Sequence, residues 1–360
     1  MDRRAFLKTS GAAAAASALP WRVARAADGW TTYEVVTRVD VLEPKGLTQA
    51  WVPLPLSSDT PWFKNIGSSW SGNAVRAEIA SEGKYGVTLL YAAWHEGEAT
   101  PVVEVTSRFM TRDANVDLSA PGTSSERLSA AQRAIYTAPT HLIPTDGIVR
   151  DTARQVTEGA KTDVEKARAI YEWVVENMFR DPKVRGCGWG DIKTMLETRN
   201  FGGKCGDLNA MFVGLARASG IPARDVYGVR VAPSKYGYKS LGTGSPDVSK
   251  AQHCRAMFFA ESYGWVPVDP ADVRKVVLEE PPGHLPLDHP KVEAARKRLF
   301  GNWEMNYLAY NMGHDVALPG SSGPRLPYLM YVNAETGGER RDQHDPEDLQ
   351  YKIVSHGAVG

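Results

Sequence analysis

Hydrophobic and polar residues alternate with a period of two between residues 30 and 112. The first run has its apolar or β-branched positions at Tyr33, Val35, Thr37, Val39 and Val41. Later strand-like runs cover residues 87–94 and 102–110, and clusters of Pro, Gly and Ser separate them. Because successive side chains of a strand face opposite sides of a sheet, this pattern predicts an N-terminal β-sandwich-like domain over residues 30–115.

Helical periodicity replaces this pattern in the next third of the chain. Residues 116–160 are polar and then weakly helical, with breaks at Pro139 and Pro144, and we expect a connecting helical segment there. Thr162 and Glu165 then form a capping-box pattern. A stripe at helical spacing follows, made of Ala167, Ile170, Tyr171, Val174, Val175 and Met178. The pattern predicts a helix that ends before Pro182.

A second amphipathic helix is predicted after the segment Gly202-Gly203-Lys204-Cys205. Its apolar stripe consists of Leu208, Met211, Phe212 and Leu215, and Gly220-Ile221-Pro222 ends it. Strand-like runs follow at residues 226–231, 256–259 and 265–268. Helices followed by a sheet predict an α+β core over residues 161–280. Residues 281–360 form a C-terminal extension with a short helix near 291–300, an aromatic segment at 303–310 and a strand at 349–354.

The N-terminus has the three regions of an export signal. Arg3-Arg4-Ala5-Phe6-Leu7-Lys8 precedes an alanine-rich apolar run, and the small-residue site Ala24-Arg25-Ala26 follows it. The paired arginines resemble a twin-arginine translocation signal. We therefore predict a signal peptide over residues 1–26, cleaved after Ala26, and a periplasmic or otherwise exported protein. The alternative is a buried N-terminal helix.

Composition and charge exclude several classes of protein. The 360 residues are 42% apolar and 23% charged, as in an ordinary soluble globular protein. The full chain has 42 basic and 42 acidic residues, and loss of residues 1–26 leaves 37 and 41, a net charge of about −4. This balance predicts no binding to nucleic acid. After the signal, no apolar stretch is long enough to cross a membrane.

Three cysteines, Cys187, Cys205 and Cys254, remain in a chain destined for an oxidising compartment. An odd number leaves at least one thiol free, and the spacings match no zinc-ligand pattern. The histidines are also scattered, so we expect neither a metal site nor a cofactor. Cys254 is expected to face away from its neighbour His253 on a strand, as a core residue or as a disulfide partner of Cys187.

Cys205 is the best candidate for a nucleophile. It precedes a predicted helix, where free N–H groups and the helix dipole lower a thiol pKa and where amides can donate to an oxyanion. His253 begins a later strand and Asp269 ends the next one. An odd number of residues between Phe258 and Gly264 would place His253 and Asp269 on one face of the hairpin, whereas an even number would separate them.

The ordered motifs resemble the transglutaminase-like superfamily. They are Gly202-Gly203-Lys204-Cys205-Gly206-Asp207, Ser219-Gly220-Ile221-Pro222-Ala223-Arg224, His253, and Gly264-Trp265-Val266-Pro267-Val268-Asp269-Pro270. The resemblance covers about residues 160–275. It implies a papain-like α+β fold in which Cys205, His253 and Asp269 form the catalytic triad.

Some features depart from the family pattern. Cys254 and Arg255 directly follow the histidine, where many members carry an aromatic or acidic residue. An upstream side chain often stabilises the oxyanion in the family, and Trp189 is the candidate here. Asp207 has two interpretations, favourable placement in the first helical turn or a functional contact.

Two classes of function follow from the sequence. The first is acyl transfer through a Cys205 acyl-enzyme, giving a cysteine peptidase or amidase with water and a crosslinking transferase with an amine. Peptides, proteins and cell-wall peptides are the expected substrates. The second is a non-catalytic module that binds a peptide or protein. A disulfide-exchange role would need a paired motif such as C-x-x-C, which is absent. The pattern leaves the oligomeric state open.

Overall fold

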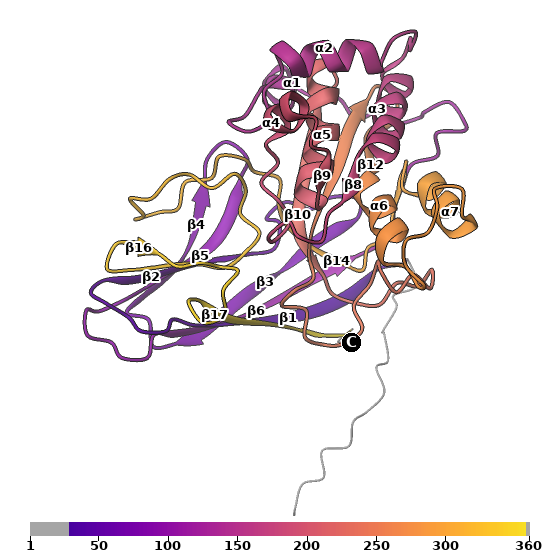
Figure 1. Cartoon of the computed structure of the whole chain (residues 1–360). Helices are drawn as coiled ribbons and strands as arrows, with labels where there is room; N and C mark the ends of the chain where they lie inside the picture. Colours follow the sequence, from indigo (N-terminus) through magenta and orange to yellow (C-terminus); the bar gives the residue numbers. More distant parts are fainter. Residues whose placement is uncertain (1–28, 358–360) are drawn as a thin grey trace, which may run out of the picture.

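The computed structural model describes residues 29–357, and within them it confirms the α+β class. Helices gather on one side of the molecule, and a β-sandwich forms the other (Figure 1). The predicted export signal lies outside the described residues. None of the helices in residues 29–357 is long and apolar enough to cross a bilayer.

Two antiparallel sheets form the sandwich. One consists, in order, of β17 (Gln350–His356), β1 (Thr31–Asp40), β6 (Val102–Thr111) and β3 (Phe63–Gly72). The other consists of β16 (Glu339–Arg340), β15 (Asn333–Thr336), β2 (Thr48–Pro53), β5 (Val87–Trp94) and β4 (Arg76–Glu82). Alternate residues of these strands pack an apolar core that includes Val39, Val52, Leu90, Trp94 and Val105.

C-terminal residues complete both halves of the molecule. β17 pairs antiparallel with β1, with Asp40 opposite Gln350 and Glu34 opposite His356. β15 pairs with β2, and β14 (Tyr307–Asn311) pairs with a strand of the central sheet. The C-terminal extension, whose fold the sequence leaves uncertain, is therefore built into both sheets of the sandwich and into the central sheet. Local patterns do not reveal this, because a strand's partner is chosen by tertiary packing.

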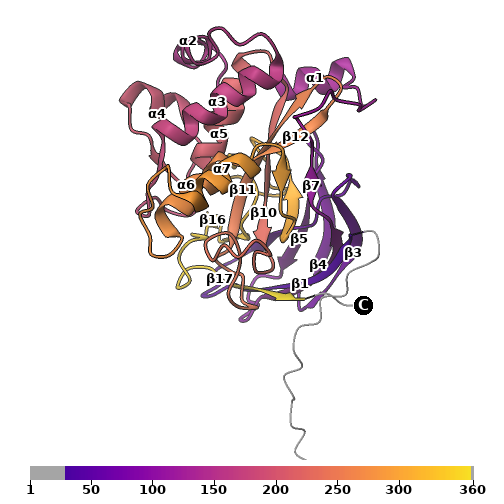
Figure 2. The same ribbon diagram turned by 90° about the vertical axis from the view of Figure 1, so that its right-hand side faces the viewer.

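The central sheet has the order β12 (Gly264–Val268), β11 (Gln252–Ala260), β10 (Ala223–Arg230) and β14. Helix α5 (Cys205–Ala218) packs against β10 and β11 and is buried along nearly its whole length. Its neighbours are α2 (Gly147–Val156), α3 (Asp163–Asn177), α4 (Ile192–Thr198) and α6 (Pro270–Glu279). Figure 2 shows this helical layer on one side of the sheet and the sandwich on the other.

Smaller elements connect these layers. α1 (Ala130–Thr137) packs against α5 and β10, and α7 (Pro290–Arg298) packs against α6. β7 (Ala114–Asn115) pairs with β13 (Asn302–Trp303) and ties the two halves together. β8 (Phe179–Arg180) runs parallel to β9 (Gly202–Gly203) just before Cys205.

The two predicted amphipathic helices, α3 and α5, are confirmed, and each shows the start or stop signal that predicted it. Thr162 Oγ1 accepts from Glu165 N at 3.2 Å, and Glu165 Oε2 accepts from Thr162 N at 3.0 Å, so the capping box starts α3. Helix α5 ends at Ala218, and Gly220 adopts a left-handed conformation with φ of +81° directly after it.

The hairpin register is also confirmed. Ala256 pairs with Val268, Phe258 with Val266, and Ala260 with Gly264, so the connecting turn holds three residues, 261–263. An odd number therefore separates Phe258 from Gly264. This register puts His253 and Asp269 on the same face, at the end of the hairpin where α6 begins.

Candidate active site

Cys205 is the first residue of α5 and lines a cleft of about 720 Å³, which we call the thiol cleft. Its side chain is only 3% exposed. Cys187 and His253 line the same cleft. The Gly206 N–H donates to the Cys187 carbonyl at 2.7 Å, which holds the segment before α4 against the start of α5. The structure therefore brings the predicted thiol and imidazole into one cavity.

His253 and Asp269 form a buried hydrogen-bonded pair. His253 Nε2 lies 2.7 Å from Asp269 Oδ2. Asp269 is the N-cap of α6, and its Oδ1 accepts from Asp272 N at 3.0 Å and from Asn209 Nδ2 at 3.3 Å. Tyr307 donates its hydroxyl to the His253 carbonyl at 2.7 Å. The imidazole is thereby fixed through both its ring and its backbone.

A second carboxylate and an arginine, which the sequence patterns did not single out, complete this buried group. Asp272 Oδ1 lies 3.3 Å from His253 Nε2. Arg230 Nη2 contacts the two oxygens of Asp272 at 2.5 and 2.7 Å, and both side chains are nearly inaccessible. Asp272 stands three residues after Asp269, in the first turn of α6. This spacing is a local signal that could have identified Asp272 as a neighbour of Asp269. Arg230 lies 42 residues from its partner and offers no such signal.

Electrostatics favour a charged imidazole. Burial, the largest effect, and Arg230 act to lower the pKa of His253, but the carboxylates of Asp272 and Asp269 outweigh them and raise this pKa above its ordinary value. Burial alone would raise the pKa of Asp272; Arg230 and His253 reverse this and hold it well below the usual range. The two carboxylates therefore favour the protonated form of His253.

The pKa of Cys205 is lowered well below that of an ordinary thiol. The Cys187 thiol is the largest cause and the Cys254 thiol the next. Burial opposes them, and the His253 imidazole adds to them. In contrast, the pKa of Cys187 and that of Cys254 are both raised. One thiolate stabilised by neighbouring thiols and an imidazolium is the state that attacks carbonyl carbon.

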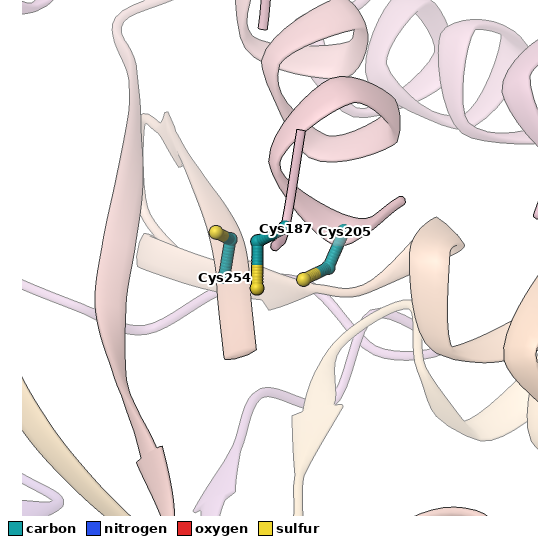
Figure 3. Close-up of side chains that lie close together, drawn as sticks. All are labelled: Cys187, Cys205 and Cys254. Atoms are coloured by element: carbon teal, nitrogen blue, oxygen red, sulfur yellow. The ribbon is translucent and has the colours of Figure 1, made fainter. Parts of the chain in front are cut away.

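The three cysteines form a cluster that the sequence did not predict. Their sulfurs lie within 4.8 Å of one another, and all three are buried free thiols (Figure 3). Cys187 comes from the loop before α4, Cys205 from the start of α5 and Cys254 from β11. Cys254 is a fully buried core residue, as one of the two alternatives expected, and it does not form the disulfide with Cys187 that the other alternative proposed. Its free thiol also lies close to the nucleophile candidate.

Asp207 joins the start of α5 to the glycine-rich loop that carries Cys187. Its Oδ1 accepts from Gly190 N at 2.9 Å and its Oδ2 accepts from Lys204 N at 2.9 Å. Burial, despite these hydrogen bonds, raises the pKa of Asp207 to about 6. Gly188 must remain a glycine here, because its φ is +85° and a Cβ would lie 1.7 Å from Asp207 Oδ2.

Trp189 lies apart from the other predicted residues. Its side chain is 69% exposed and lines two smaller hollows, one with Gly190 and the other with Asp207, rather than the thiol cleft. Its backbone N–H bonds to Asp207. The structure thus does not bring the indole together with Cys205 and His253.

Two groups of described side chains have the proximity that a metal site requires. They are the three cysteines and the set of His253, Asp269 and Asp272. The second group already has partners for its charges in Arg230 and in the hydrogen bond between His253 and Asp269. The cysteine cluster has the soft donors that suit thiophilic ions.

Comparisons with known proteins match two segments of the chain to known families. A model described as the transglutaminase-like superfamily matches residues 150–270, and a model of the twin-arginine translocation signal matches residues 1–20. The second match shows that the chain is directed to export. An uncharacterized protein from Haemophilus influenzae is 35% identical over 342 residues, which cover 90% of each chain.

One solved structure shares the fold at low sequence identity, and a second is similar over a large part of the chain at a lower TM-score. A candidate cysteine protease from Cytophaga hutchinsonii aligns with 90% of this chain and 97% of its own, at 14% identity and a TM-score of 0.53. The periplasmic domain of TgpA from Pseudomonas aeruginosa aligns with 74% of this chain and 92% of its own, at 13% identity and a TM-score of 0.34.

Proposed function

Since the chain belongs to the transglutaminase-like superfamily, we propose that it is an exported cysteine enzyme that acts on amide bonds of peptides or proteins. Cys205 is the nucleophile, His253 the general acid and base, and Asp269 the residue that orients His253. One observation carries the proposal: a thiol of lowered pKa lines the same cleft as a histidine that is hydrogen-bonded to a buried aspartate.

The reaction begins with attack of the Cys205 thiolate on the carbonyl carbon of the substrate amide. Negative charge develops on the carbonyl oxygen. The Cys205 N–H belongs to the first turn of α5, whose amides have no acceptor within the helix, and it can donate to this oxygen. His253 gives its proton to the leaving nitrogen as the carbon–nitrogen bond breaks, which leaves a thioester on Cys205.

The thioester then reacts with a second nucleophile. Neutral His253 takes a proton from water or from an amine, and the attack releases the Cys205 thiolate. Water gives a carboxylic acid, which makes the protein a peptidase or amidase. An amine gives a new amide, which makes it a crosslinking transferase. Peptides, protein side chains and cell-wall peptides are the substrate classes that fit either outcome.

The test is the rate of iodoacetamide alkylation at each cysteine between pH 5 and 9, read by peptide mass spectrometry. We expect Cys205 to react well below about pH 8.5, the ordinary pKa of a thiol, and to need a higher pH for the same rate in His253→Ala, because the imidazole is one of the groups that lower its pKa. Cys187 and Cys254 are internal controls, because their pKa values are raised. A Cys205 that titrates like a free thiol, or that is unchanged by His253→Ala, would contradict the catalytic assignment and favour a peptide-binding module.

A further inference from the structure

The thiol cleft has a strong excess of positive charge. Its basic lining residues are Arg180, Arg185, Lys204, Arg230, Lys239, Lys250 and Lys275, whereas its acidic ones are Asp247 and Glu279. The chain as a whole has equal numbers of basic and acidic residues. Cations are therefore concentrated around Cys205 while the rest of the surface carries the compensating acids. A concave site with one sign of charge focuses its field on an entering ligand.

Ion pairs account for only part of this charge. Arg230 is paired with Asp272, Arg185 with Asp342, and Glu279 serves both Arg180 and Lys275. Within residues 29–357, Lys204, Lys239 and Lys250 have no carboxylate within 4 Å of their ammonium groups. These three charges are available to a ligand.

The three lysines lie on segments that lead directly to the proposed catalytic residues. Lys204 immediately precedes Cys205 at the start of α5. Lys239 and Lys250 are exposed and belong to the 231–251 connection between β10 and β11, which leads to His253. All three lysines line the same cleft as Cys205 and His253, so a peptide bound in that cleft lies in the field of their ammonium groups.

We propose that the thiol cleft selects anionic peptides, with carboxylates on one or both sides of the amide that Cys205 attacks. This inference rests on the proposed function. The free ammonium groups attract such carboxylates. A basic peptide of the same length is repelled by the same groups. Selection acts mainly on the rate of association, so it weakens with salt.

The experiment measures covalent labelling of Cys205 by two matched probes. Both are short peptides with the same chloroacetamide group at the centre, flanked by two glutamates in one probe and by two lysines in the other. Iodoacetamide gives the neutral reference rate. The variants are Lys239→Gln/Lys250→Gln, and Lys45→Gln/Lys297→Gln as the control, since Lys45 and Lys297 are exposed and do not line the cleft.

At low ionic strength we expect the glutamate probe to label Cys205 about tenfold faster than the lysine probe. The ratio should fall at least about threefold in Lys239→Gln/Lys250→Gln, remain in the control, and approach one at about 1 M salt, where the Debye length is about 3 Å. Equal labelling by the two probes, with normal iodoacetamide reactivity, overturns this inference alone. Absence of Cys205 labelling by all three reagents overturns the proposed function and the inference with it.

Discussion

The buried carboxyl of Asp207 allows a direct test of what stabilises the start of α5. The pKa of this carboxyl is raised to about 6 by burial, although backbone N–H groups of Lys204 and Gly190 bond to it. In the unfolded chain its pKa is about 3.9. Between these two pH values the folded protein keeps a proton that the unfolded chain has lost. The free energy of unfolding therefore falls as the pH rises through this window.

The size of this effect follows from the difference between the two pKa values. A difference of about two units corresponds to about 3 kcal/mol, lost progressively between about pH 4 and pH 6. Asp207→Asn carries no charge at any pH and lacks this contribution. The amide also offers one acceptor fewer to the backbone N–H groups, which adds a loss that does not depend on pH.

The assay is urea unfolding of the wild type and of Asp207→Asn at pH 4, 5, 6 and 7. We expect the free energy of unfolding of the wild type, minus that of the variant, to decrease by about 2 kcal/mol from pH 4 to pH 7, because part of the total is already lost at pH 4. Taking this difference cancels other titrating groups. Asp163→Asn, in the first turn of α3, is the control for the same chemical change. A difference that rises with pH, or stays constant, would refute the argument that burial outweighs the hydrogen bonds.

Three further predictions concern the neighbours of Asp207 and Cys205. Gly188→Ala should destabilise the protein by about 2 kcal/mol more than Gly97→Ala in urea unfolding, because both glycines have φ of +85° but only Gly188 would place a Cβ against Asp207. Arg230→Met should cost about 3–5 kcal/mol by removing the bidentate partner of the buried Asp272 carboxylate, which then keeps its contact with His253. Adding Asp272→Leu should recover most of this loss, and failure to do so would contradict the ion-pair explanation. Cys187→Ala should move the pH midpoint of Cys205 alkylation to a higher value, and by more than Cys254→Ala does. The reason is that the Cys187 thiol is the largest cause of the lowered Cys205 pKa. An unchanged midpoint would argue against this role of Cys187.

Local sequence signals determined the elements that carry the candidate site. The capping box of α3, the glycines before α5 and the Gly220-Ile221-Pro222 stop each act within a few residues, so the sequence alone predicts them. The hairpin register follows from strand alternation and turn length, and it joins His253 to Asp269. These short-range rules, together with the ordered motifs, are enough to propose the triad.

Long-range packing decided the rest. β3 and β4 were not predicted as separate strands, since their side chains are largely exposed and lack a clear apolar alternation. The strand β17 pairs with β1, which lies more than 300 residues earlier in the chain. Arg230 forms its buried ion pair with Asp272, 42 residues later. The sequence also did not predict that lysines gather around the thiol cleft, because the total charge does not show where the fold places each charged residue.

Patterns within one element or one turn were enough to predict the α+β class, the export signal, the helix that begins at Cys205 and the hairpin that aligns His253 with Asp269. Packing between distant segments places Cys187 and Cys254 beside Cys205, leaves the indole of Trp189 outside the cleft, and uses C-terminal strands to complete both halves of the molecule. These contacts join residues far apart in the chain, and no local pattern records the packing energy that selects them.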